Sequence, residues 1–592
     1  MTQLSGERAL ALLEDITSNA ESAQHTILSQ ILSQNSNTEY LRGLLHRDGG
    51  SNDSSLQPHT FKRIAPLTCY EDIQPYIQRI ADGDKSPILA DCPVRELLRS
   101  SGTSSGKPKF LPAVEGDSQR RILMSVFTES VLHRDLEGLD DGKEGFFQVV
   151  SPRILTTGGV LTQSLLTSFL NNPEVEQSIR ARNASPIEVV AGCEDVRQST
   201  YCQLLCALRQ RQEVVRLGAS FACTFLHVMY VLKNKWRELV EDIRTGSLNE
   251  AEVVDSKVRK AMERQIKGPD PPLAMQVEKE CCRQPLWQGI VRRLWPRAKC
   301  VACVVTGSME QYIPMLEFFC GGLPLVSSMY GATEGVFGIN MDPLCSPYEV
   351  SYVILPNMAY CEFLPLDSPK DEDEMSVHQS QLVDLVDVKL GHEYDVVVTT
   401  FAGLYRYRVG DCLQVTGFYN KTPQFRIVGR KNVVLSVATD KTDEATLQKA
   451  IQMAMMKHLE ASSSCQLVDY TSFTDVSMFP GHYVLFWEVD GKVDEAIELS
   501  LNPLVMRACC DTIEECLDTT YKRGKAGNWI GPLEIRVVRQ GTFHCLMEYS
   551  IGVVGVSLGQ YKTPRVVKLA PLLELLNSRV SHCFYASNFK AS

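Results

Sequence analysis

Short apolar segments that alternate with helical patterns limit the folds open to this chain more than any other feature. Between about residues 85 and 435, candidate strands rich in β-branched and aromatic residues lie at 146–150, 300–305 and 396–400, and residues 225–241 have the apolar spacing of a helix. Strands that alternate with helices are typical of an α/β domain, because each connecting helix covers a face of the sheet. The sequence therefore predicts an α/β fold for this region.

The length of the chain calls for more than one domain. At 592 residues it is too long for a single core, so we expect two or three domains. The pattern changes near residues 430–445, where the apolar run 433–435 precedes Thr442, Asp443 and Glu444. Thr442 is a candidate N-cap, and the two acids suit the positive end of a helix dipole. We place a domain boundary at this point.

Beyond that boundary the pattern fits a smaller domain. Candidate strands at 483–489 and 533–538 are separated by a region that includes the turn-rich segment 524–531. A small α+β domain of about 150 residues accounts for this pattern. We predict a large N-terminal domain over residues 1–435 and a smaller, mobile C-terminal domain over residues 436–592.

Charge and composition narrow the partners. The net charge of −11 argues against nucleic acid, whose phosphates need a basic face. No apolar run approaches the roughly 18 residues of a membrane helix, and the N-terminus lacks the pattern of a signal peptide. The 20 cysteines are thinly spread and include one CxxC pair at 300–303, which predicts buried free thiols in a reducing cytosol rather than a zinc site. We expect a monomeric, cytoplasmic protein that binds neither nucleic acid nor membrane.

The first chemical motif is Ser-Ser-Gly-Thr-Ser-Ser-Gly-Lys-Pro-Lys at residues 100–109. Glycines let backbone N–H groups approach a phosphate, hydroxyls donate hydrogen bonds and lysines supply charge. The motif is not a Walker A loop, because three residues instead of four separate Gly102 from Gly106 and Pro108 replaces the hydroxyl that would bind Mg²⁺. We expect a phosphate-binding loop; the alternative is a polar surface loop.

The second motif, residues 330–335, follows a candidate strand at 323–326. α/β folds bind ligands in turns that follow strand ends. Tyr330 could stack on a base, Thr333 could donate to a phosphate oxygen, and Glu334 could hold Mg²⁺, which needs only one or two carboxylates besides phosphate oxygens. A purely structural turn is the alternative.

The third motif, residues 405–411, ends in Asp411, which we expect at the end of a strand. A carboxylate accepts two hydrogen bonds and therefore matches the diol of a ribose. A salt bridge from Asp411 to Arg406 or Arg408 is the alternative.

Together the motifs resemble the three nucleotide motifs of the adenylate-forming enzymes, the superfamily of acyl-CoA ligases and luciferases. Within it the chain most resembles the plant acyl-acid–amido synthetases of the Gretchen Hagen type, over nearly its whole length. Further segments that carry the resemblance are residues 75–80, 305–309, 400–411, 440–444, 480–483, 531–538 and 560–565.

The resemblance implies a luciferase-like fold and a reaction in two steps. The carboxylate of an acyl acid attacks the α-phosphate of ATP, and the amine of an amino acid then attacks the acyl carbon of the adenylate. ATP and Mg²⁺ are implied as cofactors, and the smaller domain is implied to swing between the two steps. Glu334, as the metal ligand, and Lys562 are implied as catalytic residues. The implied nucleotide-binding residues are Ser100, Ser101, Thr103, Tyr330, Thr333, Glu334, Asp411, Lys441 and Lys562.

The acyl acid is implied by the branch of the family. Members that conjugate jasmonate carry a His before the second motif and a Trp after it, where this chain has Ser328 and Val336. Gly331 is instead similar to the jasmonate and benzoate branches, and the segment 110–112 is closer to the jasmonate branch. Indole-3-acetic acid is the first expectation, with jasmonate or a benzoate as the alternative. The implied substrate-binding residues are Arg216, whose guanidinium would pair with the acid, and Tyr312, Met329, Val336 and Phe337.

Two other functions stay open at this point. A homologue that binds a nucleotide or hormone without turnover would tolerate loss of Glu334, Asp411 and Lys562, all of which are present. A CoA ligase would form a thioester, and only the family resemblance argues against it.

Overall fold

The computed structural model divides into two compact units. The first comprises Met1–Val409, Leu413–Ile427 and Ser557–Gln560, and the second Gly410–Cys412, Val428–Val556 and Tyr561–Ser592. The limits 1–435 and 436–592 for the two domains remain a prediction. The structure describes residues 6–47, 56–104, 107–148, 150–283, 287–366, 381–430, 434–435, 437, 442–459, 466–475, 477, 481–490, 502–517, 519–526, 530–553, 557–567 and 569–587.

A parallel sheet of four strands lies in the first unit. Its order is β3 (Lys143–Phe147), β6 (Val214–Phe221), β7 (Cys300–Val304) and β8 (Leu325–Val326), with every neighbouring pair parallel. Six consecutive residues of β6 are buried, as expected for a strand with helices on both faces. Gly218 permits the close approach of β7, since a Cβ there would lie 2.2 Å from the Ala302 carbonyl oxygen. The predicted strand at 300–305 corresponds to β7, whereas the predicted strand at 146–150 overlaps β3 only at residues 146 and 147, because β3 begins and ends three residues earlier.

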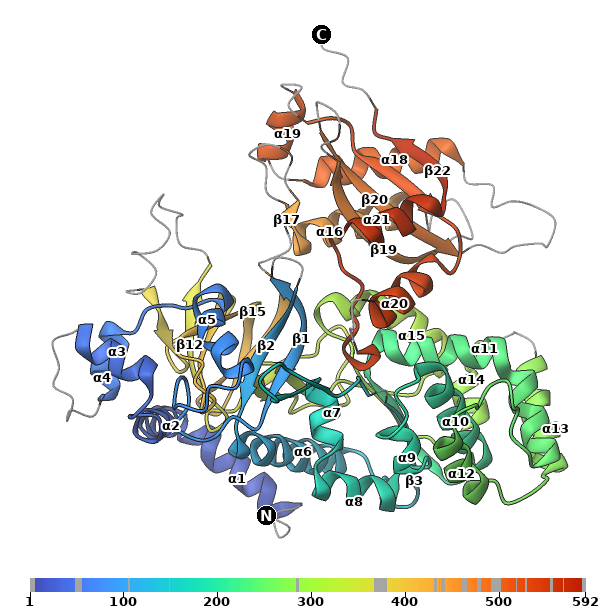
Figure 1. Cartoon of the computed structure of the whole chain (residues 1–592). Helices are drawn as coiled ribbons and strands as arrows, with labels where there is room; N and C mark the ends of the chain where they lie inside the picture. Colours follow the sequence, from blue (N-terminus) through green and yellow to red (C-terminus); the bar gives the residue numbers. More distant parts are fainter. Residues whose placement is uncertain are drawn as a thin grey trace. The chain divides into compact units, whose positions relative to one another are not determined.

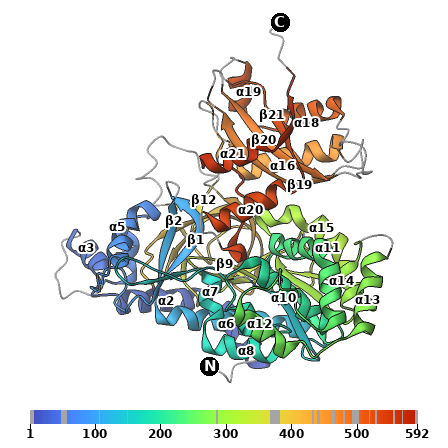
Figure 2. The same ribbon diagram turned by 45° about the vertical axis from the view of Figure 1, so that its right-hand side comes forward.

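Helices cover this sheet (Figures 1 and 2). The predicted helix at 225–241 is the centre of α11 (Ala222–Thr245), which packs on β6 and β7 and ends at Gly246 in the left-handed conformation. The neighbouring helices are α7 (Leu165–Leu170), α8 (Pro173–Arg182), α9 (Ile187–Val190), α10 (Val196–Arg209), α12 (Ser256–Gln265), α13 (Pro271–Cys282), α14 (Ile290–Leu294) and α15 (Ile313–Cys320), with the 3₁₀-helix η1 (Gly307–Tyr312) before α15.

A second sheet, of eight strands, contains two of the three motifs and belongs to the first unit except for Gly410–Cys412 of β15 and the end of β16 from Val428. Its spatial order is β13 (Val383–Asp384), β12 (Tyr360–Pro365), β14 (Glu393–Thr399), β15 (Tyr407–Tyr419), β16 (Thr422–Arg430), β11 (Tyr352–Ile354), β10 (Gly335–Ile339) and β9 (Met329–Ala332). β14 contains most of the predicted strand at 396–400 and pairs antiparallel with β12. The sheet therefore brings the second and third motifs, which are far apart in sequence, into one layer.

A smaller sheet and the N-terminal helices complete the first unit. The order of the sheet is β2 (Lys107–Ala113), β1 (Glu96–Ser104), β5 (Leu161–Gln163) and β4 (Ile154–Leu155). The long helix α6 (Glu115–Asp135) follows β2 and packs against α1 and β10. The remaining helices are α1 (Glu7–Ser18), α2 (Ala20–Gln34), α3 (Glu39–Arg47), α4 (Pro58–Ile64) and α5 (Tyr70–Ala81).

The second unit is a four-stranded mixed sheet between two layers of helices. The order is β19 (Gln466–Asp475), β20 (His482–Asp490), β21 (Glu534–Val538) and β22 (Val580–Tyr585). β20 contains the predicted strand at 483–489, and β21 contains all but the first residue of the predicted strand at 533–538. Alternate residues of β20 face opposite layers, with Leu485 and Trp487 against α16 (Glu444–Ala454) and α18 (Pro503–Cys516), and Val484 and Phe486 against α20 (Thr542–Gly552) and α21 (Ala570–Ser578). The other elements are η3 (Met455–Leu459), α19 (Thr519–Ala526) and η4 (Leu558–Gln560), of which η4 belongs to the first unit.

The N-cap predicted at Thr442 is wrong. Thr442 pairs with Leu435 in a short ladder of β17 (Val434–Leu435) and β18 (Thr442–Asp443), and α16 begins two residues later at Glu444. The Thr442 hydroxyl accepts a hydrogen bond of 3.1 Å from the Tyr483 hydroxyl instead of capping the helix. A buried tertiary contact has therefore replaced the local one.

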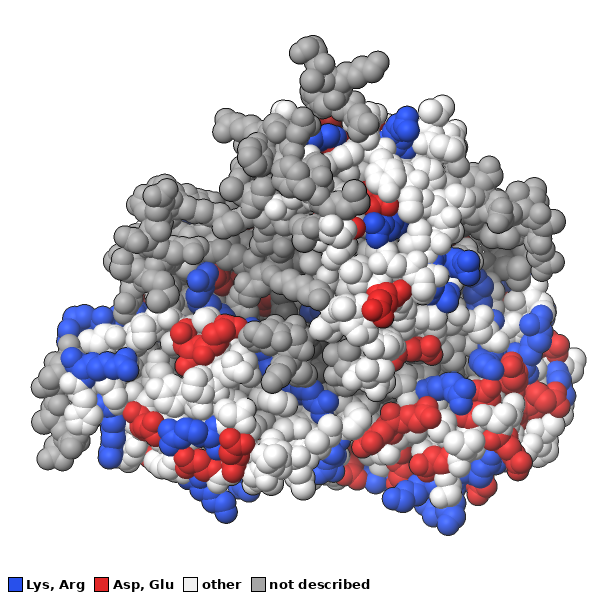
Figure 3. Space-filling view, turned by 45° about the horizontal axis from the view of Figure 1, so that its top comes forward, with Lys and Arg blue, Asp and Glu red and all other residues white. Residues whose placement is uncertain are grey.

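Charged side chains of both signs share the surface, and most cysteines lie in the interior. On the face shown in Figure 3, Lys and Arg side chains of the described residues lie among Asp and Glu side chains. The cysteines of the described region are free thiols, and most of them are buried or half-buried, as predicted. Within the same region, none of the helices has both the length and the apolar character that crossing a bilayer requires.

Candidate active site

The first motif forms a β-hairpin, not the loop predicted from its composition. β1 runs through Ser104 and β2 starts at Lys107, with Thr103 opposite Pro108. The register shifts between Arg99 and Thr103, so a β-bulge interrupts the ladder within the motif. A bulge leaves backbone groups outside the ladder and is common beside active sites. Ser100 is half-buried, whereas the side chains of Ser101 and Thr103 lie outside what the structure describes.

The second motif is the tip of another hairpin. Ala332 of β9 pairs with Gly335 of β10, which leaves Thr333 and Glu334 as the two residues of the turn, both half-buried. The carboxylate and hydroxyl predicted to meet the phosphates and metal therefore stand at the end of two strands. Tyr330 lies further down β9 and is 4% exposed.

The ring of Tyr330 is already largely covered by protein. Its centroid lies 5.7 Å from that of Phe337 and 6.1 Å from that of Tyr352. These contacts hold the ring in the core, and its predicted stacking on a base remains a prediction.

The third motif runs inside a strand and does not end one. β15 begins at Tyr407 and continues through Asp411 to Tyr419, so the predicted place of Asp411 at a strand end is wrong. Gly410 has a φ of 85°, a left-handed conformation that interrupts the regular extended pattern within the strand. Asp411 itself is buried, with 4% exposure.

The arginines of the third motif have carboxylate partners other than Asp411. Arg406 donates two hydrogen bonds to Glu362, of 2.8 and 2.6 Å, and Arg408 donates to Asp395 at 2.8 Å. Their guanidinium groups therefore fix β15 to β12 and β14. This arrangement argues against the structural alternative in which Asp411 serves them as a salt-bridge partner.

Tyr407 links the three motifs within the first unit. Burial raises the pKa of its phenol, and the negative charge of Glu334 raises it further, with Tyr70 acting in the same direction. The Tyr70 hydroxyl accepts a 3.0 Å hydrogen bond from the backbone N–H of Phe110, and the ammonium of Lys109 lies 5.1 Å from the centre of the Tyr70 ring. Lys109, Glu334 and Tyr407, one from each motif, are thus connected through neighbouring groups.

The segment before α5 explains why Tyr70 lies there. The Thr68 backbone N–H donates to the Arg406 carbonyl oxygen at 2.9 Å, and the Arg408 N–H donates to the Thr68 carbonyl oxygen at the same distance. Thr68 thereby forms an isolated parallel bridge with Tyr407. Sequence reasoning missed Tyr70, because no local pattern links residues 68–70 to the third motif.

A polar cluster of buried and half-buried residues, also missed from the sequence, holds the start of β1. The Glu96 carboxylate accepts hydrogen bonds from Gln163 and Ser168, and Arg121 donates to the Ser168 hydroxyl at 2.9 Å. These contacts connect β1 with β5, α7 and α6. The strand that leads into the first motif is therefore fixed by side chains from three other elements.

Polar side chains also follow the carboxyl ends of the parallel strands, where α/β folds bind ligands. The Ser220 hydroxyl donates to Gln148 at 3.1 Å, and the Tyr352 hydroxyl lies 3.1 Å from that of Thr306 and 2.7 Å from that of Ser327. Of these residues, Thr306 and Ser327 directly follow the predicted strands at 300–305 and 323–326, and this position is the signal that the sequence offers for them.

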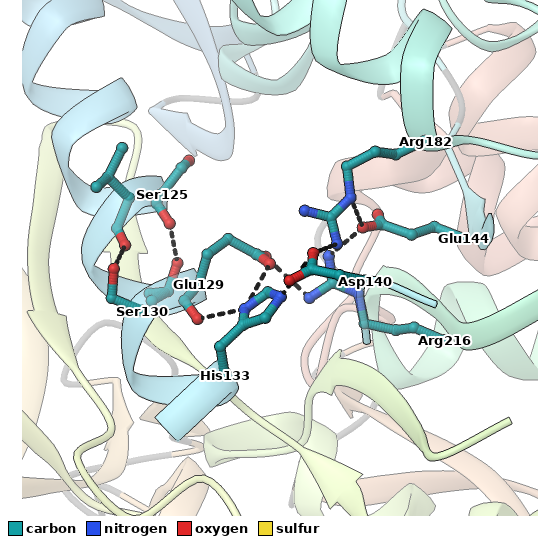
Figure 4. Close-up of polar contacts among 10 residues, drawn as sticks. Ser125, Glu129, Ser130, His133, Asp140, Glu144, Arg182 and Arg216 are labelled. Carbon is teal, nitrogen blue, oxygen red and sulfur yellow. Dashed lines mark hydrogen bonds and ion pairs between the residues drawn. The ribbon is translucent and has the colours of Figure 1, made fainter. Parts of the chain in front are cut away.

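The structure contradicts the substrate role predicted for Arg216. Arg216 is 7% exposed, and its two terminal nitrogens lie 2.8 Å from Glu129 and 2.7 Å from Glu144 (Figure 4). Arg216 is also the third residue of β6, near the amino ends of the parallel strands and away from the edge where ligands bind. Its guanidinium therefore neutralises protein carboxylates and is not available to the carboxylate of an acid.

Arg216 belongs to a larger ion-pair cluster that joins α6, β3, β6 and α8. Arg182 lies 3.1 Å from Glu144 and 3.5 Å from Asp140, and His133 Nε2 lies 3.1 Å from Asp140. Figure 4 shows these side chains pointing toward one another. The cluster therefore connects elements of the scaffold.

The other predicted substrate residues divide between two apolar clusters. Tyr312 and Phe337 belong to the main core with Tyr330, whereas Val336 and Met329 pack with α1 and α6. Val336 and Phe337 are neighbours in β10 at a register shift with β9, and their side chains lie in different apolar clusters. One flat slot lined by all of these residues does not fit this arrangement.

The predicted lysines are placed differently. Lys562 is half-buried and belongs to the second unit. Lys441 lies outside the described residues.

Among the residues that the structure does describe, no group of three or more His, Cys, Asp or Glu side chains could hold a metal ion. A metal at Glu334 would therefore depend on phosphate oxygens for its other ligands, as is usual for Mg²⁺.

Comparison with known proteins places these features in a family. The models of the GH3 family N-terminal, central and C-terminal domains match residues 9–325, 352–430 and 445–571. The chain is 46% identical over 599 aligned positions to indole-3-acetic acid-amido synthetase GH3.17 of Arabidopsis thaliana, covering 98% of this chain and 96% of the relative.

Solved structures agree with this placement. The chain matches the AtGH3.15 acyl acid amido synthetase in complex with 2,4-DB at 44% identity with a TM-score of 0.87, covering 98% of this chain and 97% of that one. It also matches a 2-hydroxyisobutyryl-CoA ligase bound to 2-HIB-AMP, at 11% identity with a TM-score of 0.51, covering 97% and 92%. The second match confirms the predicted fold of the adenylate-forming enzymes, and the first confirms the predicted resemblance. The chain belongs to the GH3 family.

Proposed function

We propose that this protein is an ATP-dependent ligase that joins an acyl acid to an amino acid through an acyl-adenylate. In the first step a carboxylate oxygen of the acid attacks the α-phosphorus of ATP, an acyl–phosphate bond forms, and pyrophosphate leaves. In the second step the neutral amine of the amino acid attacks the acyl carbon, a C–N bond forms, AMP leaves, and the amine proton passes to solvent. The mixed anhydride supplies the good leaving group that a free carboxylate lacks.

The observation that carries this proposal is the neighbourhood of Lys109, Glu334 and Tyr407 in the first unit. Each comes from a different nucleotide motif. The negative charge of Glu334 raises the pKa of Tyr407, and the Lys109 ammonium lies over the ring of Tyr70, which neighbours Tyr407. Adenylation depends chiefly on positioning and on neutralising phosphate charge, which the Lys109 cation and a metal ion held by the Glu334 carboxylate would provide.

The residue roles follow from this neighbourhood. The hairpin with Ser100, Ser101 and Thr103 would bind phosphates, and Thr333 would donate to a phosphate oxygen. Glu334 would hold Mg²⁺, which when bound neutralises charge on the phosphates. Asp411 would accept hydrogen bonds from the ribose hydroxyls. Lys562 and Lys441 would contact phosphate, and Tyr330 would lie near the adenine.

Indole-3-acetic acid is the acid that we propose first. The relative GH3.17 is named for this acid, and residues Ser328 and Val336 replace the His and Trp expected of a jasmonate-conjugating enzyme. The GH3.15 structure holds 2,4-DB. Jasmonate and benzoates remain the alternatives, because Gly331 resembles both branches and residues 110–112 resemble the jasmonate branch.

The cytoplasmic location, the monomeric state, the role in auxin signalling and the absence of nucleic-acid and membrane partners remain predictions from the sequence.

Pyrophosphate release with a panel of acids tests the proposal. The purified chain is mixed with ATP, Mg²⁺ and one acid at a time, with and without amino acids. We expect release that depends on the acid and is fastest with indole-3-acetic acid. Release from no acid of the panel would favour a non-catalytic binding protein, and release that becomes catalytic only when CoA is added would favour a CoA ligase.

A further inference from the structure

Lys562 lies in an extended segment whose neighbours alternate between interior and surface. Extended chains place successive side chains on opposite faces. The buried positions are Tyr561, Thr563, Arg565 and Val567, and the half-buried positions between them are Lys562, Pro564 and Val566. The lysine therefore points to the face opposite from the residues on either side of it.

The backbone after Lys562 is bonded to β19. The Ser472 N–H donates to the Arg565 carbonyl oxygen at 2.9 Å, and the Val567 N–H donates to the Ser472 carbonyl oxygen at 2.8 Å. Ser472 accordingly forms a parallel bridge with Val566, and the Thr471 hydroxyl donates to the Pro564 carbonyl oxygen. The segment thus continues the sheet of the second unit by a short pairing at its edge.

Asp469 holds the inward face of the segment. One carboxylate oxygen accepts from Arg565 Nη1 at 2.7 Å and from the Tyr470 N–H at 2.8 Å, and the other accepts from the Thr563 hydroxyl at 2.7 Å. Asp469, Thr563 and Arg565 are 5%, 5% and 4% exposed. The Arg565 guanidinium also lies 4.4 Å from the centre of the Tyr470 ring. We call Asp469, Arg565 and Thr563 the carboxylate clamp.

The place of Asp469 in β19 is itself irregular. The register with β20 shifts between Leu467 and Asp469, so a bulge precedes the aspartate and turns its side chain toward the segment. A buried ion pair is a weak source of stability, because desolvating both charges offsets most of their attraction. The more specific consequence of the clamp is geometric, since it fixes the residue that directly follows Lys562.

We propose that Asp469 is a positioning residue for Lys562, acting through Arg565 and Thr563. The proposal rests on the proposed function, in which the Lys562 ammonium meets phosphate charge during adenylation. A displacement of about 1 Å at a reacting group costs up to about 100-fold in rate. The clamp keeps the lysine fixed to the second unit, so that the ammonium moves with this unit as one body.

The experiment is a double-mutant cycle between Asp469→Asn and Lys562→Ala in the full chain. The measured quantity is the rate of acid-dependent pyrophosphate release, with amide formation from separately prepared acyl-adenylate as the second readout. We expect Asp469→Asn to slow release about 10- to 100-fold and to leave the second readout nearly unchanged. On the Lys562→Ala background the same change has less than about a twofold effect, because the lysine through which it acts is gone.

Glu488→Gln is the matched control. Glu488 lies in β20 as the register partner of Asp469 in β19, is 6% exposed, and accepts hydrogen bonds from the N–H groups of Gly541 and Phe543 at the start of α20. It is an equally buried carboxylate of the same sheet that does not hold the lysine segment. Its effect on release, whatever its size, should be the same with and without Lys562.

Thermal unfolding shows whether Asp469→Asn is folded. If it is not, a second variant tests the same inference. Thr563→Val removes one donor to Asp469 and keeps the ion pair, and the cycle is repeated with it. Wild-type rates in a folded clamp variant, or effects that multiply fully with Lys562→Ala, would overturn the inference while the function stands. Absence of release from the wild-type chain would overturn the proposed function and the inference together.

Discussion

Arg406 and Glu362 form a bidentate ion pair in which both side chains are 3% exposed. Arg406 also donates to the carbonyl oxygens of Lys62 and Ala65, at 2.7 and 3.1 Å, and has a φ of 44°. A non-glycine residue adopts this conformation only where its surroundings determine it. The pair therefore fixes the backbone directly before β15, which begins at Tyr407. Asp411 follows four residues later in the same strand.

Replacement of Glu362 by Gln should destabilise the first unit strongly. Removing one partner leaves a buried charge without compensation, which costs about 3–5 kcal/mol. Urea unfolding followed by tryptophan fluorescence measures the loss. Glu241→Gln is the control, since Glu241 pairs with Arg244 at the surface, where both side chains are more than a third exposed, and such pairs contribute about 0–1 kcal/mol. Equal losses of stability from the two changes would contradict the structural role given to the buried Arg406–Glu362 pair.

Replacement of Asp411 by Asn should weaken the binding of ATP. Hydrogen bonds to a charged group contribute about 1.5–3 kcal/mol, so the KM for ATP should rise roughly 10- to 150-fold. The KM for the acid should change little. Initial rates over a range of ATP concentrations provide the measurement, and an unchanged KM for ATP would reject ribose binding by Asp411.

Replacement of Glu334 by Gln should slow pyrophosphate release about 10- to 100-fold, and raising the Mg²⁺ concentration should restore part of the rate. Glu71→Gln is a matched control, because Glu71 is a second carboxylate whose charge raises the pKa of Tyr407 but lies outside the motif. Its Mg²⁺ dependence should equal that of the wild type. The metal role of Glu334 fails if both variants respond to Mg²⁺ alike.

The second unit should lose stability in acid through Glu534. Burial alone would raise the pKa of Glu534, but hydrogen bonds from His482 and Arg536 outweigh burial and lower the pKa to about 2. A lowered pKa means that the carboxylate stabilises the fold above its unfolded value of 4.5 and that this stabilisation disappears as the pH falls toward 2. The shift corresponds to ~3 kcal/mol.

Unfolding of Glu534→Gln and of the wild type should be compared between pH 5 and about pH 2. The variant should start less stable and lose less stability over this interval, because it lacks the carboxylate that becomes protonated. Parallel curves for the two proteins would show that Glu534 does not carry the acid sensitivity.

The sequence was informative where one periodic pattern filled a whole element. α11, β7 and β20 were predicted because their apolar residues repeat at the helical spacing or form continuous buried runs. The adenylate-forming fold was predicted from the order of three motifs, which is independent of their exact conformation.

Local patterns failed where distant partners decide the structure. The residues at 100–109 form a hairpin because Glu96, Gln163 and Ser168 fix the strand before them, although glycine and serine favour a loop. The family resemblance implies a substrate role for Arg216, and the sequence does not show that Glu129 and Glu144, both distant in sequence, pair with its guanidinium. Thr442 is likewise not the predicted helix cap, because its hydroxyl accepts a hydrogen bond from Tyr483, a partner that is distant in sequence.

The most direct test of the central claim is mass spectrometry of the complete reaction. The protein is incubated with indole-3-acetic acid, ATP, Mg²⁺ and a mixture of amino acids, and Lys562→Ala provides the control. The account predicts an amide of the acid with one or more amino acids, formed together with AMP, and little or none of it from the variant. Recovery of the acid unchanged, without AMP, across indole-3-acetic acid, jasmonate and benzoates would contradict it.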